Sequence, residues 1–233
     1  MVLACGCDAV LHLERIPEPP KGIVWESVFV MDNAPATGDT HTFGAQASAA
    51  GNAIVVQVAC SQSSSPPTGV TLVAPGWQFQ PIGAIVGHSP DWAAAFTAIA
   101  PDSVPATFTV TWTGSASPPC TNMHDMGDEF SDTRHTNDPQ TFEDHAESAG
   151  VGNCHGTVKT KHGFDAVWAA CTTNTHITAP GPGYILGADD GTGDNTEWRV
   201  TTDPANTSED VTFTSFDQNA AYAMTTIAIA ANP

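Results

Sequence analysis

Basic side chains are scarce in this chain. Its 233 residues include 6 Lys and Arg against 25 Asp and Glu, which gives a formal net charge of −19. A negative field of this size repels phosphate backbones and anionic membrane surfaces, so we do not expect nucleic acid as a partner. The acidity suits a protein of salty or extracellular fluid, although charge that only maintains solubility would look the same.

Long apolar runs and catalytic motifs are missing as well. No stretch approaches about eighteen uninterrupted apolar residues, so we expect no membrane span. There is no Gly-x-Ser-x-Gly, no phosphate-binding Gly/Lys loop and no His-Glu-x-x-His, and we therefore expect no enzymatic activity. A carboxylate pair for glycoside hydrolysis stays open, because acidic residues are too numerous for any one pair to stand out.

What the chain does have is a nearly continuous apolar and β-branched run at residues 51–60, typical of a central strand covered on both faces. A weaker copy of this neighbourhood follows about a hundred residues later, around residues 165–171. The offset between matching landmarks falls from 111 residues at Cys60 and Cys171, through 106 residues at Asp91 and Glu197, to 103 residues at Phe108 and Val211. This pattern indicates a degenerate internal duplication, with each half supplying matching strands to one sandwich.

Other segments carry β-type patterns. Residues 106–113 alternate strictly between Thr and apolar residues, and the Ala-rich residues 92–100 are assigned as strand because their counterpart, 197–202, is a β-type run. Residues 114–150 predict only one or two short strands among loops. The remaining predicted strands are 23–31, 40–47, 69–74, 78–82, 157–161, 164–172, 177–178, 184–186, 210–215 and 222–230.

The first 22 residues differ from the rest. They hold Cys5 and Cys7 and a Pro-rich stretch at 17–20, which predicts an N-terminal arm ending in a stiff linker, followed by a single duplicated domain over residues 23–233. Residues 1–5 are similar to the end of a bacterial lipoprotein signal, but the basic and apolar segments that should precede the cysteine are missing. Acylation, intermolecular bonding and metal capture are open for Cys5 and Cys7, with unpaired thiols as the default.

The chain resembles a known type of module. The resemblance rests on the strand that opens at Gly51-Asn52, the turn at residues 75–77, the alternating Thr/aromatic strand, the repeat of this pattern in the second half and the closing strand. The module is the jelly-roll-like β-sandwich common in bacterial exoproteins and in phage tail and head-decoration proteins, and the resemblance covers residues 44–232. It implies an all-β antiparallel sandwich without catalytic activity, serving as a structural or attachment subunit of an extracellular particle or filament, such as a virion decoration or tail-fibre protein. Self-assembly, or assembly with other particle subunits, through the N-terminal arm is then expected. The alternatives are a secreted carbohydrate-binding module and a glycoside hydrolase or lyase on the same scaffold.

Four cysteines predict two disulfides. If residues 161–164 form a two-residue hairpin, Cys154 faces Cys171 across the ladder at a distance that a disulfide can bridge. Cys60 and Cys120 then form the second pair. Oxidised pairs would indicate life outside a reducing cytosol, whereas simply buried thiols are the alternative.

The residues 189–197 give the best local metal hypothesis. Ca²⁺ prefers several oxygen ligands from a Gly-bent loop, and this segment offers four carboxylates, although its spacing is not that of a helix-loop-helix calcium loop and a solvated acidic turn is the alternative. Transition-metal ligands could come from His124 with Asp125 and Asp128, or from residues 144–145, but neither has paired-His spacing. No other cofactor is expected. The candidate calcium ligands are Asp189, Asp190, Asp194 and Glu197.

Tryptophan offers a possible sugar surface. Trp112 and Trp168 fall on apolar strand faces, which predicts core positions. Trp77, Trp92 and Trp198 lie at turns or strand starts, where an exposed ring could stack on a surface glycan, with core packing as the alternative for each.

Overall fold

The computed structural model describes residues 22–32, 38–46, 48–61, 65–101, 107–115, 119–134, 141–202 and 204–232. Within these ranges the chain forms strands and no helix, so none that could cross a membrane. The predicted N-terminal arm and the sulfurs of Cys5 and Cys7 lie outside the described residues. The first eight strands are β1 (Val24–Asp32), β2 (Thr40–Gly44), β3 (Ala53–Ser61), β4 (Gly69–Val73), β5 (Gln80–His88), β6 (Asp91–Ile99), β7 (Thr107–Thr113) and β8 (Asn122–Ser131). The next eight are β9 (Phe142–Val151), β10 (Cys154–Lys159), β11 (Ala166–Thr173), β12 (Ile177–Ala179), β13 (Ile185–Asp189), β14 (Asn195–Val200), β15 (Ser208–Ser215) and β16 (Ala221–Ile229).

The two halves of the chain have the same antiparallel topology. The first half forms a five-stranded sheet, β1-β8-β3-β6-β5, and a three-stranded sheet, β2-β7-β4. The second half repeats both orders strand for strand as β9-β16-β11-β14-β13 and β10-β15-β12. The predicted all-β, antiparallel, jelly-roll-like sandwich fold with two degenerate halves is therefore confirmed.

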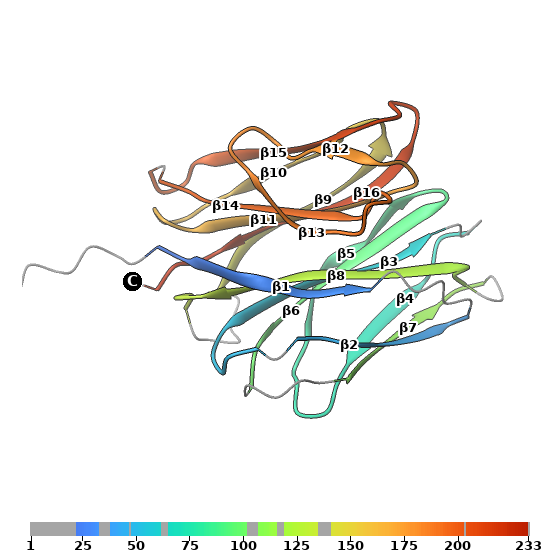
Figure 1. Cartoon of the computed structure of the whole chain (residues 1–233), viewed down its shortest axis with the longest axis horizontal. Coiled ribbons are helices and arrows are strands. Elements are labelled where there is room, and N and C mark those ends of the chain that lie inside the picture. The colour runs from blue at the N-terminus through green and yellow to red at the C-terminus, as the bar shows by residue number, and fades with distance from the viewer. Residues whose placement is uncertain are drawn as a thin grey trace, which may run out of the picture.

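The sequence pattern predicted that the two halves share one sandwich. Instead, each half closes a sandwich of its own, and the two sandwiches are stacked. Figure 1 shows four layers, with the five-stranded sheets in the middle and the three-stranded sheets outside. One apolar core, including Phe108 and Trp112, fills the first sandwich, and another, including Phe213 and Met224, fills the second. A third core, with Phe130, Trp168 and Ile227 among its buried members, lies where the five-stranded sheets meet. The reason is that β3 and β11 are buried along their whole length on both faces, so each sheet needs a cover on either side.

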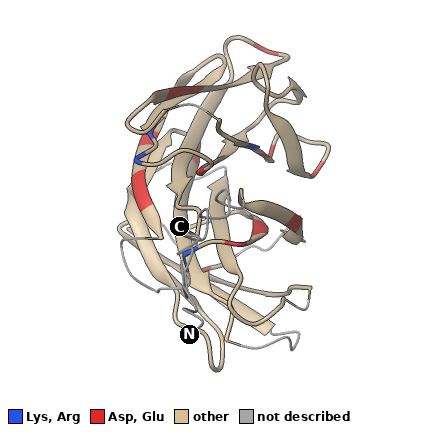
Figure 2. Cartoon of the chain, turned by 90° about the vertical axis from the view of Figure 1, so that its left-hand side faces the viewer, with Lys and Arg blue, Asp and Glu red and all other residues tan. Residues whose placement is uncertain are grey.

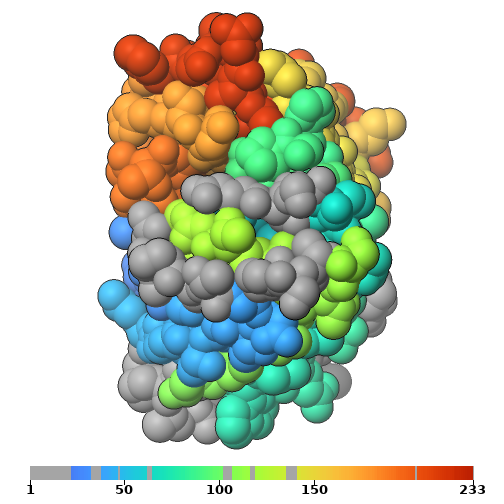
Figure 3. All heavy atoms as spheres, turned by 90° about the vertical axis from the view of Figure 1, so that its right-hand side faces the viewer, coloured from blue at the N-terminus to red at the C-terminus, as the bar shows by residue number. Residues whose placement is uncertain are grey.

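The space-filling view in Figure 3 shows the same stacking, with the second half above the first. The two five-stranded sheets stack edge strand over edge strand: β1 lies next to β13 at one margin, and β5 lies next to β9 at the opposite margin. The arrangement makes the molecule pseudo-symmetric about the middle core.

The segment 114–150 is more regular than its sequence indicates. It contains two strands of 10 residues each, β8 and β9, where only one or two short strands were predicted. The strand β8 is buried over eight consecutive positions although it carries His124, Asp125, Asp128 and Glu129. Buried polar side chains remove the apolar alternation that identifies a strand.

Two disulfides join Cys60 to Cys120 and Cys154 to Cys171, with Cα–Cα distances of 5.3 and 6.3 Å. The hairpin argument for Cys154 and Cys171 is wrong, because β10 pairs with β15 and β11 pairs with β14 and β16. The Cys154–Cys171 disulfide instead connects the two facing sheets of the second sandwich. Both bridges indicate a non-reducing environment.

Candidate functional site

A polar cavity of about 180 Å³ lies at the junction between the two sandwiches. Both halves of the chain supply its walls, and no Lys or Arg lines it. Figure 2 shows how few basic side chains the molecule carries. The lining residues are Ser61, Asp91, Asn122 and His124 from the first half, and Thr173, Asn174, Thr192 and Asp194 from the second.

The alternation of β8 sends His124 toward the second half. Met123 belongs to the core of the first sandwich, whereas Met126, three residues on, belongs to the core between the sheets. His124 shares the second orientation, since its Nδ1 lies 3.0 Å from Asp194 Oδ2 and 3.6 Å from Asp190 Oδ2. Successive side chains of a strand point to opposite faces, so the neighbouring carboxylate of Asp125 points away from this cavity.

A tight turn between β13 and β14 holds the two aspartates. Asp190 Oδ1 accepts the backbone N–H groups of Thr192, Gly193 and Asp194 at 2.7, 3.0 and 3.1 Å. The turn therefore wraps around one carboxylate oxygen, while the other accepts the hydroxyl of Thr192 and faces His124. Gly193 is required here, because its φ is 146° and a Cβ would lie 2.3 Å from a backbone oxygen.

Burial and mutual charge set the protonation of these groups. Burial by itself would lower the pKa of His124, but the two aspartates outweigh it and raise the pKa to about 10. Burial would raise the pKa of Asp190, yet hydrogen bonds from His124 and from its own turn hold that pKa below its usual value. Burial raises the pKa of Asp194, with His124 opposing. Burial also raises the pKa of Asp91 to about 6.

Several acceptor atoms in this cavity have no protein donor in hydrogen-bond geometry. They are both carboxylate oxygens of Asp91, Oδ1 of Asn122 and Oδ1 of Asp194. Asp91 has an exposed fraction of 0% and Asp194 of 3%. Nδ1 of His124 also lacks hydrogen-bond geometry, in spite of the short distances to its two carboxylates. Buried acceptors normally have partners, so this cavity has the chemistry to hold a cation, ordered water or both.

The two halves contribute matching aspartates. Asp91 directly precedes the β6 residue that pairs with Cys60, and Asp194 directly precedes the β14 residue that pairs with Cys171. Counted from the two cysteines, Asp91 therefore corresponds to Asp194, whereas the sequence pattern matches Asp91 with Glu197. The sequence pattern does not mark Asp91 as a site residue; the ladder register identifies it.

The four predicted calcium ligands do not come together. Asp190 and Asp194 meet at His124, but Asp189 is exposed and accepts the backbone N–H of Gly191 at 2.8 Å. Glu197 is buried away from the cavity, where it accepts the backbone N–H of Gly181 at 2.7 Å. Burial raises the pKa of Glu197 to about 7.

The other carboxylates suggested as partners of His124 have different roles. Asp125 lies 3.4 Å from Nε2 of His41 within the first half. Asp128 accepts the indole N–H groups of Trp25 and Trp168 at 2.9 and 2.8 Å, as well as the hydroxyl of Thr196. At residues 144–145, Asp144 accepts a backbone N–H of β10 at 2.8 Å.

The three tryptophans proposed as a sugar surface are half-buried and belong to different clusters. Trp77 and Trp92 pack against the core of the first sandwich. Trp198 packs against the core between the sheets and stacks on Trp25 with ring centroids 5.5 Å apart. Trp198 therefore packs against a different core from Trp77 and Trp92. Trp112 and Trp168 are fully buried core residues.

A second group of possible metal ligands, Glu143, His162 and Asp165, lies in the second half. Nδ1 of His162 is 2.5 Å from Glu143 Oε1, and the remaining carboxylate oxygens accept backbone N–H groups of Lys161, His162 and Ala231 at 2.8 to 3.2 Å. Burial, with Glu143 nearby, raises the pKa of Asp165 to about 6. These contacts give the group a structural role, since its carboxylates bind the backbone of the neighbouring turn.

Comparison of the chain with protein-family models, curated proteins and solved structures gives no match.

Proposed function

We propose that this protein is a non-catalytic structural or attachment subunit of an extracellular particle or filament, of the virion-decoration or tail-fibre type. In this proposal it assembles with further copies of itself through one margin of the molecule and through its N-terminal arm. The two disulfides support a place outside the cytosol.

The observation that carries the proposal is an apolar margin formed by two sheet edges. The strands β1 and β13 end their five-stranded sheets and lie side by side. Their exposed large apolar residues are Val24, Met31, Ile185 and Leu186, with exposed fractions of 45, 48, 54 and 36%. We call these four residues the β1–β13 edge. Open sheet edges with apolar side chains are pairing surfaces that isolated proteins usually block.

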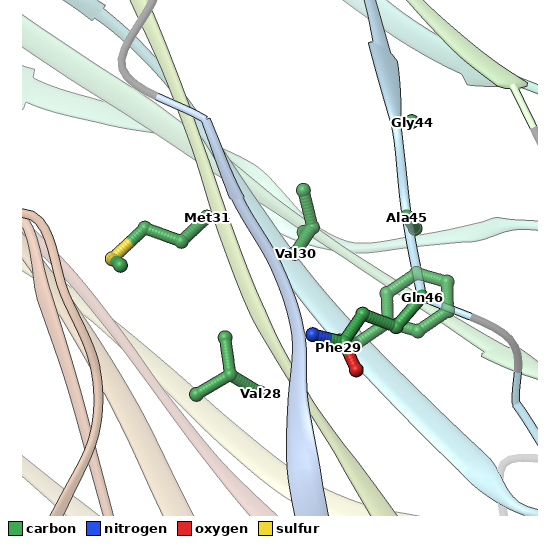
Figure 4. A pocket seen from close by; sticks show the side chains of 7 residues that line it. All are labelled: Val28, Phe29, Val30, Met31, Gly44, Ala45 and Gln46. Atoms are coloured by element: carbon green, nitrogen blue, oxygen red, sulfur yellow. The ribbon is translucent and has the colours of Figure 1, made fainter.

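A surface hollow continues this edge. It has a volume of about 560 Å³ and is lined by residues 28–31 of β1 and residues 44–46 beyond β2. Figure 4 shows Val28 and Met31 on the side of β1 away from Gly44, Ala45 and Gln46. In the chain, β1 follows directly after residues 1–22, so the proposal assigns the N-terminal arm to the same contact as this edge. A second copy is therefore the occupant that we assign to the edge.

The test is the mass of the intact, non-reduced protein, measured by light scattering over a range of concentrations. We expect the parent protein to form an oligomer. The Met31→Glu and Ile185→Glu variants should each dissociate at higher protein concentration than the parent does. Val151→Glu is the matched control, because Val151 is 53% exposed on β9, a strand at the opposite margin next to β5. A protein that stays monomeric at every concentration with its disulfides intact would overturn the proposal.

A further inference from the structure

We propose that His124, Asp190 and Asp194 bind one divalent transition-metal ion, such as Zn²⁺, that joins the two sandwiches, with Asp91 accepting hydrogen bonds from metal-bound water. This inference does not depend on the assembly proposed above. Three possible ligand atoms, Nδ1 of His124 and one oxygen of each aspartate, lie within 4.8 Å of one another.

The geometry around Nδ1 favours a metal ion over a hydrogen bond. Nδ1 is 3.0 and 3.6 Å from the two carboxylate oxygens, yet it has hydrogen-bond geometry with neither. A metal ion between the three atoms needs no N–H direction, because it binds the nitrogen lone pair. Imidazole nitrogen and carboxylate oxygen are both regular ligands of Zn²⁺.

The other ring nitrogen has the support expected for a metal-binding histidine. Nε2 of His124 lies 2.5 Å from the side-chain amide of Asn122. The amide oxygen and nitrogen of Asn are assigned from the hydrogen-bond network, and the orientation with nitrogen toward Nε2 leaves Oδ1 without a partner. Exchanging the two lets Nε2–H donate to Oδ1, so that Nδ1 is the nitrogen that binds the ion when the ion displaces its proton. Metal-binding histidines nearly always donate their second N–H in this way.

Asp91 is the independent sign of a ligand. It lines the same cavity, is 0% exposed, and has two oxygens without a protein donor in hydrogen-bond geometry. It is not among the three residues whose ligand atoms converge within 4.8 Å, so water on the metal is the donor that reaches it. The cavity of about 180 Å³ has room for the ion and several waters, since a water occupies about 30 Å³ in the liquid.

The donor set also selects the type of ion. Ca²⁺ prefers six to eight oxygens, whereas one imidazole with two carboxylates suits borderline ions such as Zn²⁺. The ligands come from both halves, His124 from β8 and the two aspartates from the β13–β14 turn. The ion therefore binds only the stacked molecule, and it should stabilise that state.

The experiment measures Zn²⁺ binding to the chelator-stripped full chain by titration calorimetry, with metal content determined after dialysis. All forms carry Cys5→Ser and Cys7→Ser, because free thiolates would bind Zn²⁺ themselves. We expect one equivalent of Zn²⁺, and a rise in melting temperature of about 5–10 °C when free Zn²⁺ exceeds Kd a hundredfold. Ca²⁺ should not replace it.

His124→Gln and Asp194→Asn should each weaken Zn²⁺ binding at least tenfold. His162→Gln is the matched control, because it removes the histidine of the second ligand group, and it should bind like the parent. X-ray absorption of the Zn²⁺-loaded parent needs no variant and should show one imidazole with oxygen ligands and no sulfur. Absence of stoichiometric Zn²⁺, binding unchanged in the two site variants, tighter binding of Ca²⁺, or a shell with sulfur or several imidazoles would each overturn the assignment.

Discussion

Asp128 provides a direct test of how the two sandwiches are joined. Its carboxylate lies on β8 of the first half and is fully buried. It accepts hydrogen bonds from Trp168 and Thr196 of the second half and from Trp25 of the first. Asp128→Ala removes this acceptor without adding bulk, so the change reports on the junction between the halves.

The expected cost follows from the donors that lose their acceptor. Trp168 and Thr196 are 0% exposed, and a buried donor without a partner costs about 1–3 kcal/mol. Trp25 is only half-buried, so its indole N–H can find water. Burial raises the pKa of Asp128, and removing a carboxylate that is costly to bury offsets part of the loss. We expect Asp128→Ala to lower the free energy of unfolding by about 2–4 kcal/mol.

The assay is urea denaturation of the non-reduced protein, followed by tryptophan fluorescence and circular dichroism. Asp128→Asn keeps the shape and one acceptor oxygen, so it should cost less than Asp128→Ala. Trp168→Phe removes one donor. The loss of unfolding free energy in the double variant with Asp128→Ala should be smaller than the sum of the two single losses by about 1 kcal/mol or more. An Asp128→Ala protein within about 0.5 kcal/mol of the parent, or effects that simply add, would show that this carboxylate does not join the halves.

Three further outcomes are expected. Because burial raises the pKa of Glu197 to about 7, the folded protein retains a proton that the unfolded chain releases near the ordinary value. Stability should therefore fall as pH rises from about 4.5 to about 7 and then level off, and Glu197→Gln should flatten this slope in urea denaturation at a series of pH values. Replacing both Cys154 and Cys171 by Ser opens a bridge with a sequence separation of 17, which should cost about 3 kcal/mol; an unchanged urea midpoint would contradict it. Gly127→Ala would place a Cβ 2.4 Å from a backbone oxygen of β3, so we expect several degrees lower melting temperature, and an unshifted calorimetric transition would refute the close approach.

Much of the fold was predictable, because its signals are local. The double-sided burial of β3, the alternation of β7 and the repeat between the halves follow from which side chains are apolar and at what spacing. The strand β8 was the exception, since its buried His124 and Asp128 hide it from an apolar pattern. Their partners lie on the other half of the chain, and only the folded structure supplies them.

The amino-acid sequence by itself determined most of the strands, the duplicated order and the four cysteines available for bridges. The tertiary structure decided that the halves form two stacked sandwiches, because each five-stranded sheet has two apolar faces to cover. It also decided which carboxylates meet. Asp190 and Asp194 reach His124 across the junction, while Glu197 points into the second sandwich, because the direction of a strand side chain depends on register and sheet packing rather than on distance along the chain.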